Sequence, residues 1–157
     1  MERTADEKLI LFVCSGNTCR SPMAAALFNH PQPPPGYRAE SAGLAAFAGD
    51  PAAEQAVDVL REDDGIDLSD HRSRPVSPWL LEQARWTAAM TAAQRDRLRS
   101  AFPELAGRIV TIGELAGAPD LQIADPFGQN KEVYRLTAGR LRGLIRLIKE
   151  RLSAEKE

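Results

Sequence analysis

A cysteine and an arginine near the start of this chain have a spacing that suits the binding of a tetrahedral anion. Cys14 and Arg20 belong to the segment Cys14–Ser21, which reads C-x5-R-S and lies between a short apolar run and a run of good helix formers. Five intervening residues are enough to wrap one phosphate group, with backbone N–H groups facing inward and Gly16 permitting the positive φ that such a nest needs. A helix beginning here adds the positive end of its dipole. The sequence therefore predicts a phosphate-binding loop.

The same loop carries a nucleophile. The helix N-terminus and the Arg20 guanidinium favour the thiolate form of Cys14, which would attack phosphorus. Arg20 has a planar fork of donors that grips two phosphoryl oxygens, whereas a lysine would act only as a point charge. Ser21 is predicted to cap the following helix and to offer its hydroxyl to the sulfur when water cleaves a phosphocysteine intermediate. The residues expected to line the anion site are Ser15, Gly16, Asn17, Thr18 and Cys19.

Phosphoryl transfer also needs a proton donor for the leaving atom, and Asp125 is the outstanding candidate. It follows a polar connector, and Pro126 restricts its backbone to extended conformations, which helps to fix the direction of the side chain. An Asp-Pro pair alone is more often a turn, so the assignment depends on the cysteine loop. We predict that Asp125 protonates the leaving group and then deprotonates the attacking water.

Strands and helices alternate along the chain, and this order must position the two groups of residues. Strands are predicted at residues 8–13, 37–42, 85–90 and 108–112, and helices after Ser21-Pro22 and at 51–60, 77–83, 91–100 and 134–152. Such alternation indicates right-handed βαβ units. We therefore expect an α/β fold, a three-layer sandwich with a central parallel sheet of about four strands flanked by helices, and the phosphate loop between the first strand and the first helix.

Length and composition indicate one domain over residues 1–157, with 1–7 as a loose tail. A formal net charge of −2 argues against a nucleic-acid binder, and no apolar run is long enough to span a membrane. The polar N-terminus lacks the apolar stretch of a signal peptide, so we expect a cytoplasmic protein. We also expect a monomer. A zinc site from Cys14, Cys19, His30 and His71 is disfavoured because the cysteines are not paired as C-x2-C and Arg20 would repel the ion. No metal or cofactor is expected.

These motifs resemble those of the low-molecular-weight protein tyrosine phosphatases. That family opens with a C-x5-R-S-P loop and has an Asp-Pro acid near its end, and the segments Glu40–Gly43 and Asp70–Arg74 resemble its Ser-Ala-Gly and Asp-His-x-x-Arg segments. The resemblance implies hydrolysis of protein phosphotyrosine through a phosphocysteine, phosphorylated proteins as partners, and phosphate-like oxyanions as inhibitors. It also implies a polar network that supports the loop, formed by Asn17, Ser21, Ser41 and His71.

Two positions leave a second substrate open. Thr18 precedes the second loop cysteine, and Phe127-Gly128 follows Asp-Pro, which is similar to the protein arginine phosphatase branch of the family. A threonine hydroxyl can hydrogen-bond a guanidinium, which an aliphatic residue cannot. Phe47 and Phe127 are expected to form aromatic walls that suit either a phenyl ring or a guanidinium plane. Phosphotyrosine and phosphoarginine therefore both remain candidate substrates.

The cysteine loop also allows three further interpretations. A phosphate-binding module without activity would need neither Cys14 nor Asp125, and this chain has both. An arsenate reductase on the same fold would need more thiols than Cys14 and Cys19. The proximity of these two cysteines suggests the hypothesis of a reversible disulfide that protects Cys14 from overoxidation.

Overall fold

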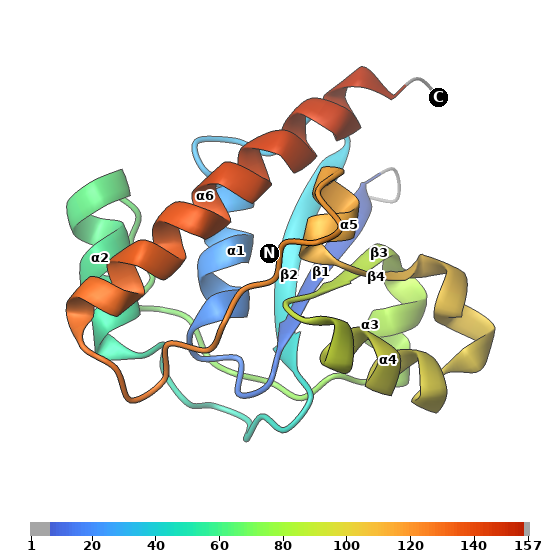
Figure 1. The fold of residues 1–157 in the computed structure, drawn as a ribbon, viewed down its shortest axis with the longest axis horizontal. Coiled ribbons are helices and arrows are strands. Elements are labelled where there is room, and N and C mark those ends of the chain that lie inside the picture. The colour runs from blue at the N-terminus through green and yellow to red at the C-terminus, as the bar shows by residue number, and fades with distance from the viewer. Residues whose placement is uncertain (1–6, 156–157) are drawn as a thin grey trace.

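The computed structural model describes residues 7–155, so most of the predicted N-terminal tail lies outside the described residues. The chain forms an α/β fold with its helices arranged around one sheet (Figure 1). The strands are β1 (Lys8–Cys14), β2 (Tyr37–Gly43), β3 (Ala84–Ala89) and β4 (Ile109–Thr111). The helices are α1 (Arg20–Asn29), α2 (Glu54–Asp64), α3 (Pro78–Gln83), α4 (Ala92–Ala101), the 3-10 helix η1 (Pro103–Arg108), α5 (Ile112–Ala116) and α6 (Lys131–Ala154).

The four strands lie in the order β2-β1-β3-β4, and every neighbouring pair is parallel. This confirms the predicted parallel sheet of about four strands. All carboxyl ends therefore meet at one edge, where parallel α/β sheets bind their ligands. Cys14 and Gly43 are register partners at this edge, so the loops that follow β1 and β2 leave the sheet side by side.

The central strand β1 is buried on both faces, which explains its continuous apolar run. Ile10 and Phe12 belong to one hydrophobic cluster, whereas Leu9, Leu11 and Val13 belong to another on the opposite face. The first cluster contains α1, α2 and α6, and α3 and α4 contribute to the second. The two clusters give the three layers predicted from the alternation of strands and helices.

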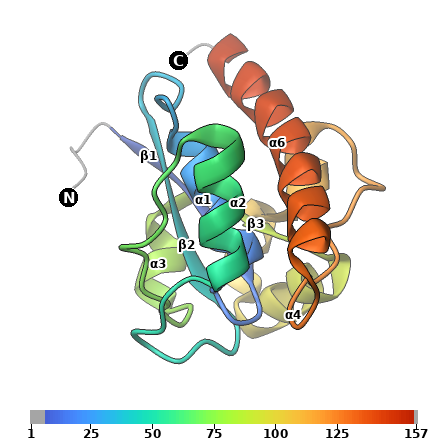
Figure 2. The same cartoon turned by 90° about the vertical axis from the view of Figure 1, so that its left-hand side faces the viewer.

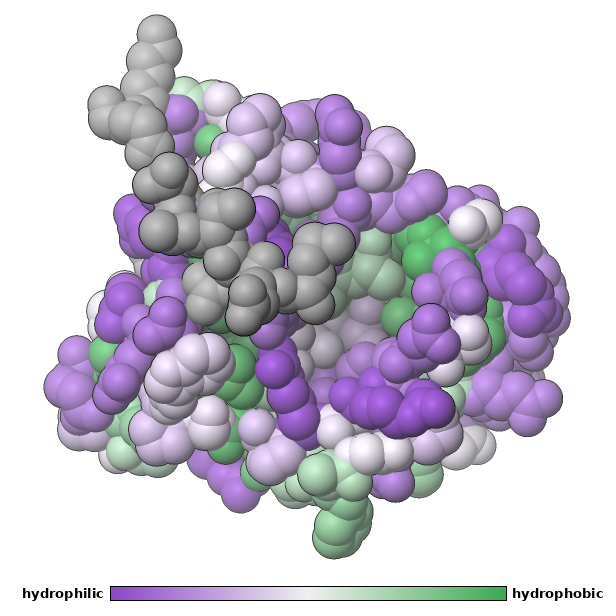
Figure 3. Space-filling model, turned by 180° about the vertical axis from the view of Figure 1, so that it is seen from behind, coloured by the Kyte–Doolittle hydropathy of each residue, from purple (hydrophilic) through white to green (hydrophobic). Residues whose placement is uncertain are grey.

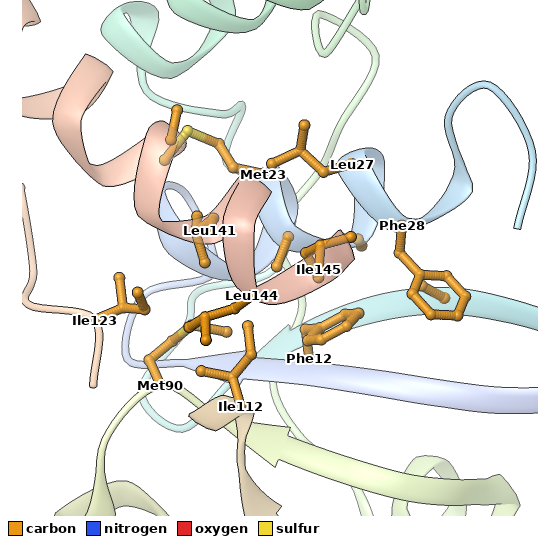
Figure 4. Packing of buried hydrophobic residues seen from close by; sticks show 14 of the residues in the cluster. Phe12, Met23, Leu27, Phe28, Met90, Ile112, Ile123, Leu141, Leu144 and Ile145 are labelled. Carbon is orange, nitrogen blue, oxygen red and sulfur yellow. The ribbon is translucent and has the colours of Figure 1, made fainter. Parts of the chain in front are cut away.

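Helix α6 forms most of the cover over α1. Leu141, Leu144 and Ile145 of α6 point towards Met23 of α1 and Phe12 of β1 in the core (Figure 4). In Figures 1 and 2 the helix runs across α1 and its N-terminal end reaches α2. Three basic side chains in the N-terminal half of α6, Lys131, Arg135 and Arg142, pair with Glu62, Asp63 and Asp64 at the end of α2. These ion pairs join the two helices.

Several predicted boundaries agree with the capping groups in the structure. Ser77 accepts a hydrogen bond from the Leu80 N–H at the start of α3, and Thr91 does so from the Gln94 N–H at the start of α4. The short helices η1 and α5 were not predicted. The strand expected at residues 108–112 covers only Ile109–Thr111, and η1 and α5 lie directly before and after it. Seen from behind, the surface is mainly hydrophilic with smaller hydrophobic areas (Figure 3). Within residues 7–155 no helix is long and apolar enough to cross a membrane.

Candidate active site

The carbonyl groups of the loop between β1 and α1 point outward because neighbouring segments donate hydrogen bonds to them. The pairs are Cys14 O with Leu44 N (2.9 Å), Ser15 O with Ala45 N (2.9 Å), Asn17 O with His71 Nε2 (2.7 Å) and Thr18 O with Ala53 N (2.9 Å). A peptide unit whose carbonyl is held outward turns its N–H the other way. The loop amides are thus arranged as an anion nest.

The residue that adopts the left-handed conformation in this loop is Asn17, with φ of 57°. We expected that role for Gly16, whose φ does not lie in the positive range. Asparagine tolerates the left-handed region better than other residues with a side chain. Here its amide is also held in place, because Asn17 Oδ1 accepts a hydrogen bond from the Arg74 N–H (2.9 Å). The prediction was therefore wrong about the residue that adopts the positive φ, which is Asn17 and not Gly16.

The sulfur of Cys14 lies 2.9 Å from the Ser21 hydroxyl. Asn17 Oδ1 is bonded to the Arg74 N–H, so the amide nitrogen Nδ2 is the atom that faces the two serines. Nδ2 donates to Ser21 Oγ at 2.8 Å and to Ser41 Oγ at 3.0 Å. Ser21 therefore accepts from Asn17, and its own proton has two acceptors within reach, the Cys14 sulfur at 2.9 Å and the Ala42 carbonyl oxygen at 3.4 Å. Ser21 does not cap α1 as predicted, since Cys19 is the N-cap and Ser21 lies inside the helix. Its hydroxyl is used by Cys14 instead.

His71 supports the same loop from outside. Its Nε2 faces the Asn17 carbonyl, which can only accept, so Nε2 must carry the proton. Burial lowers the pKa of His71 below its ordinary value of 6.5, and the cations Arg74 and Arg72 act in the same direction. The neutral ring already has the N–H that this bond needs. The four residues of the predicted network, Asn17, Ser21, Ser41 and His71, are thus brought together.

Arg20 is 4% exposed and joins the loop to the segment that carries the acid. Its Nη1 donates to the carbonyl oxygen of Ile123 at 2.9 Å, and its Nη2 lies 3.7 Å from Asp125 Oδ2. Among the described residues its buried Nε has no hydrogen-bond partner. A buried donor of this kind is costly unless a ligand satisfies it. Nε and Nη2 are therefore suited to two oxygens of one anion.

Asp125 stands over this anion site and is half exposed. Its Oδ1 accepts a hydrogen bond from the Phe127 N–H at 3.0 Å, which fixes the carboxylate in a local turn. A cavity of about 250 Å³ lies between the two loops. It is lined by Cys14, Ser15, Gly16, Thr18, Cys19, Arg20, Ala45, Asp125 and Phe127. The structure thus brings the predicted nucleophile, arginine and acid to one cavity.

Cys19 differs from Cys14 in its surroundings. Its sulfur lies 3.2 Å from the hydroxyl of Tyr134, a fully buried residue of α6. Burial raises the pKa of the Cys19 thiol, so this second cysteine stays neutral beside the nucleophile. Both cysteines are free. The disulfide suggested by their proximity stays a prediction.

Phe47, which was expected at the cavity, and His30, a ligand of the disfavoured zinc site, both lie outside the cavity lining. Phe47 is 79% exposed and does not line it, although Ala45 of the same loop does. Its role as an aromatic wall stays a prediction. His30 follows α1 at the end opposite to the cysteine loop. The alternative zinc ligands Cys14, Cys19, His30 and His71 therefore do not converge.

Sequence reasoning missed two residues that shape the loop. Gly43 lies so close to it that a Cβ atom would be 2.6 Å from the Ser15 carbonyl oxygen. Gln94 of α4 donates from Nε2 to the Ser15 hydroxyl at 3.2 Å. The Ser-Ala-Gly segment contained a signal for Gly43. The spacing of Thr91 and Gln94 indicated only a helix cap.

Known proteins resemble this chain in sequence and in fold. A family model described as low molecular weight phosphotyrosine protein phosphatase matches residues 9–157. A protein-arginine-phosphatase from Geobacillus stearothermophilus is 42% identical over 147 residues, covering 94% of this chain and 97% of that protein. A solved arginine phosphatase from that organism has a TM-score of 0.88 and 41% identity, covering 92% of each chain. A solved low molecular weight protein tyrosine phosphatase from T. tengcongensis has a TM-score of 0.86 and 41% identity, covering 92% of this chain and 99% of that one.

Proposed function

Because this chain belongs to the low molecular weight phosphotyrosine protein phosphatase family, we propose that its cavity at Cys14 dephosphorylates protein side chains in two steps. The family confirms the resemblance drawn from the sequence. It identifies the chain as a phosphatase, which supports this proposal over an inactive phosphate-binding module or an arsenate reductase. We further propose that it acts as a cytoplasmic monomer without a metal or cofactor, and that phosphate-like oxyanions inhibit it.

In the first step the Cys14 thiolate attacks phosphorus and a sulfur–phosphorus bond forms as the bond to the leaving oxygen or nitrogen breaks. Asp125 gives the leaving atom a proton. Arg20 Nε and Nη2 and the loop amides hold the equatorial oxygens, where the charge of the transition state is spread. In this proposal Arg20 and the loop amides offset the negative charge of the transferred phosphoryl group, and no metal ion takes part.

In the second step water attacks the phosphocysteine from the side that the leaving group has vacated. Asp125, now ionised, accepts the proton of this water. The sulfur leaves as a thiolate, and the Ser21 hydroxyl at 2.9 Å donates to it as the charge develops. Because Ser21 Oγ already accepts from Asn17 Nδ2, its own proton is available for the sulfur as this charge develops.

The substrate that the cavity favours is phosphoarginine, and the observation that carries this proposal is the position of Thr18. Its side chain lines the cavity with Asp125, and its hydroxyl lies 3.7 Å from the Cys19 sulfur, the one side-chain hydrogen-bond partner of this group within the described residues. A guanidinium keeps N–H donors beside the phosphoryl nitrogen, and the Thr18 hydroxyl can accept one of them. The arginine phosphatase with 42% identity over nearly the whole chain agrees with this choice.

Phosphotyrosine is the second candidate, and Phe127 favours it. This ring lines the cavity and is 71% exposed, so its face is open to a substrate. An aromatic face packs against a phenol ring, but it also stacks on a guanidinium. The tyrosine phosphatase from T. tengcongensis, with 41% identity, shows that overall similarity does not separate the two substrates.

The test compares phosphoarginine and phosphotyrosine in peptides of otherwise identical sequence. Thr18→Val removes the hydroxyl at nearly constant volume, whereas the matched control Thr18→Ser keeps it. A guanidinium N–H left without a partner costs about 1–3 kcal/mol, so Thr18→Val should lower the ratio of phosphoarginine to phosphotyrosine kcat/KM by about tenfold or more. Thr18→Ser should leave the ratio near that of the wild type.

An unchanged ratio in Thr18→Val would exclude Thr18 as the selecting residue. The phosphatase mechanism has its own check, since Cys14→Ser should abolish hydrolysis of both peptides. Hydrolysis retained by Cys14→Ser would contradict the mechanism and not merely the choice of substrate.

A further inference from the structure

Gln94 has a side-chain orientation that the backbone determines. The residue is 8% exposed at the start of α4, and its Oε1 accepts hydrogen bonds from the N–H groups of Met90 (3.0 Å) and Thr91 (3.2 Å). Backbone N–H groups only donate, so this atom must be the amide oxygen. The amide nitrogen is therefore the atom that faces Ser15, and it donates to Ser15 Oγ at 3.2 Å.

The bond from Gln94 decides what the Ser15 hydroxyl does. A hydroxyl has one proton, and an oxygen that accepts from an amide keeps that proton for another acceptor. Within residues 7–155 Gln94 is the only hydrogen-bond partner of this hydroxyl. Ser15 lines the cavity beside Cys14 and Arg20. An acceptor that enters this cavity can therefore receive the proton.

We propose that Gln94 is a positioning residue that holds the Ser15 hydroxyl as an acceptor, so that Ser15 donates its proton to an oxygen of the bound phosphoryl group. Ser15 thereby adds a donor to those of Arg20 and the loop amides. The proposal rests on the phosphatase activity proposed above but not on which phosphorylated side chain is the substrate. No atom of Gln94 itself touches the substrate.

Gln94→Glu reverses the hydrogen bond while the fold is kept. One carboxylate oxygen still accepts from Met90 and Thr91, and a negative charge is favourable at the start of a helix. The other oxygen now faces Ser15 and can only accept, so the hydroxyl must donate to it. The phosphoryl group then loses this donor. We expect kcat/KM for 4-nitrophenyl phosphate to fall about tenfold, with weaker competitive inhibition by inorganic phosphate.

Gln122→Glu is the matched control. Gln122 is exposed, and its Oε1 accepts from the Ala92 N–H at the start of the same helix, but it does not contact Ser15. The same change of charge at this position should leave kcat/KM within about twofold of the wild type. Thermal unfolding of each variant reports whether the fold is retained.

A double-mutant cycle separates positioning from a general effect of charge. Ser15→Ala removes the donor and should cost about tenfold by itself. If Gln94 acts through Ser15, Gln94→Glu should cost only about twofold more when Ser15 is already alanine. Losses that multiply to about a hundredfold would overturn the proposal, because the two residues would then act independently.

The single variant Ser15→Ala keeps the proposal open to refutation if Gln94→Glu does not fold. Wild-type kcat/KM and wild-type phosphate inhibition in Ser15→Ala would overturn it. These outcomes differ from a failure of the phosphatase assignment. In that case the wild-type chain would not hydrolyse 4-nitrophenyl phosphate, or Cys14→Ser would still hydrolyse it.

Discussion

Replacing Gly43 by alanine tests whether the second strand shapes the phosphate loop. A Cβ atom at this position would lie 2.6 Å from the Ser15 carbonyl oxygen, 2.9 Å from Ala46 Cβ and 3.0 Å from Asn17 Cβ. An ordinary contact begins near 3.4 Å, so the loop would have to move by about 0.8 Å. Two of the three neighbours belong to the loop itself. The displacement therefore falls on the residues that present N–H groups to the anion.

The magnitude follows from this displacement. Overpacking of a closely packed site costs about 1–3 kcal/mol, which should appear as a lower unfolding free energy. A misplacement approaching 1 Å in a catalytic loop costs about a hundredfold in rate. We expect Gly43→Ala to lower kcat/KM for 4-nitrophenyl phosphate by about 30- to 100-fold and to weaken inhibition by inorganic phosphate. Steady-state kinetics and urea unfolding measure the two effects separately.

Gly143→Ala is the control for adding a methyl group to a glycine. A Cβ atom at this position in α6 meets no atom within 4 Å. Alanine in a helix interior is favoured over glycine by about 0.5–1 kcal/mol, so this variant should be slightly more stable and fully active. If Gly43→Ala keeps wild-type kcat/KM and phosphate inhibition, the reasoning that the close approach of β2 shapes the loop is wrong.

Two other predictions concern the acid and the histidine. Asp125→Ala should slow the hydrolysis of phenyl phosphate by about 10²–10⁴-fold but that of 4-nitrophenyl phosphate much less, because a good leaving group needs no proton; equal losses would remove Asp125 as the acid. The pKa of His71 is lowered by burial, so its contribution to stability is present above pH 6.5 and is lost as the pH falls through the folded-state pKa. His71→Gln can keep a donor to the Asn17 carbonyl without this titration, so its unfolding free energy should fall less than that of the wild type between about pH 7.5 and pH 5. Urea unfolding at both pH values measures the difference, and equal falls would contradict the assignment.

The parts of the site that could be predicted are those encoded by neighbouring residues. The apolar run that ends at Cys14 predicts a buried strand, and the five residues up to Arg20 predict a loop around an anion. Thr91 and Ser77 stand where helix caps are expected, and both accept the hydrogen bonds of caps. The alternation of these elements was enough to predict the parallel sheet.

The parts that could not be predicted depend on residues far apart in the sequence. Gln94 and Ser15 are 79 positions apart, and nothing in either neighbourhood indicates that an amide will reach the loop. The prediction that Ser21 caps α1 was wrong, because a serine before proline has the pattern of a cap but here lies inside the helix, where its hydroxyl contacts the Cys14 sulfur as the sequence also predicted. Asn17 was overlooked as the bent residue because glycine is the usual choice for positive φ.

Arg20, which is placed to bind the anion, also donates from Nη1 to the carbonyl oxygen of Ile123. One side chain therefore contacts both the anion site and the segment that carries the acid. Ile123 lies two positions before Asp125, so a shift of the cysteine loop carries the start of the acid segment with it. The same residue is also held at the sheet, because the Ile123 N–H donates to the Met90 carbonyl oxygen directly after β3 at 3.0 Å. The place where the acid segment begins is therefore set by the sheet and by Arg20 together.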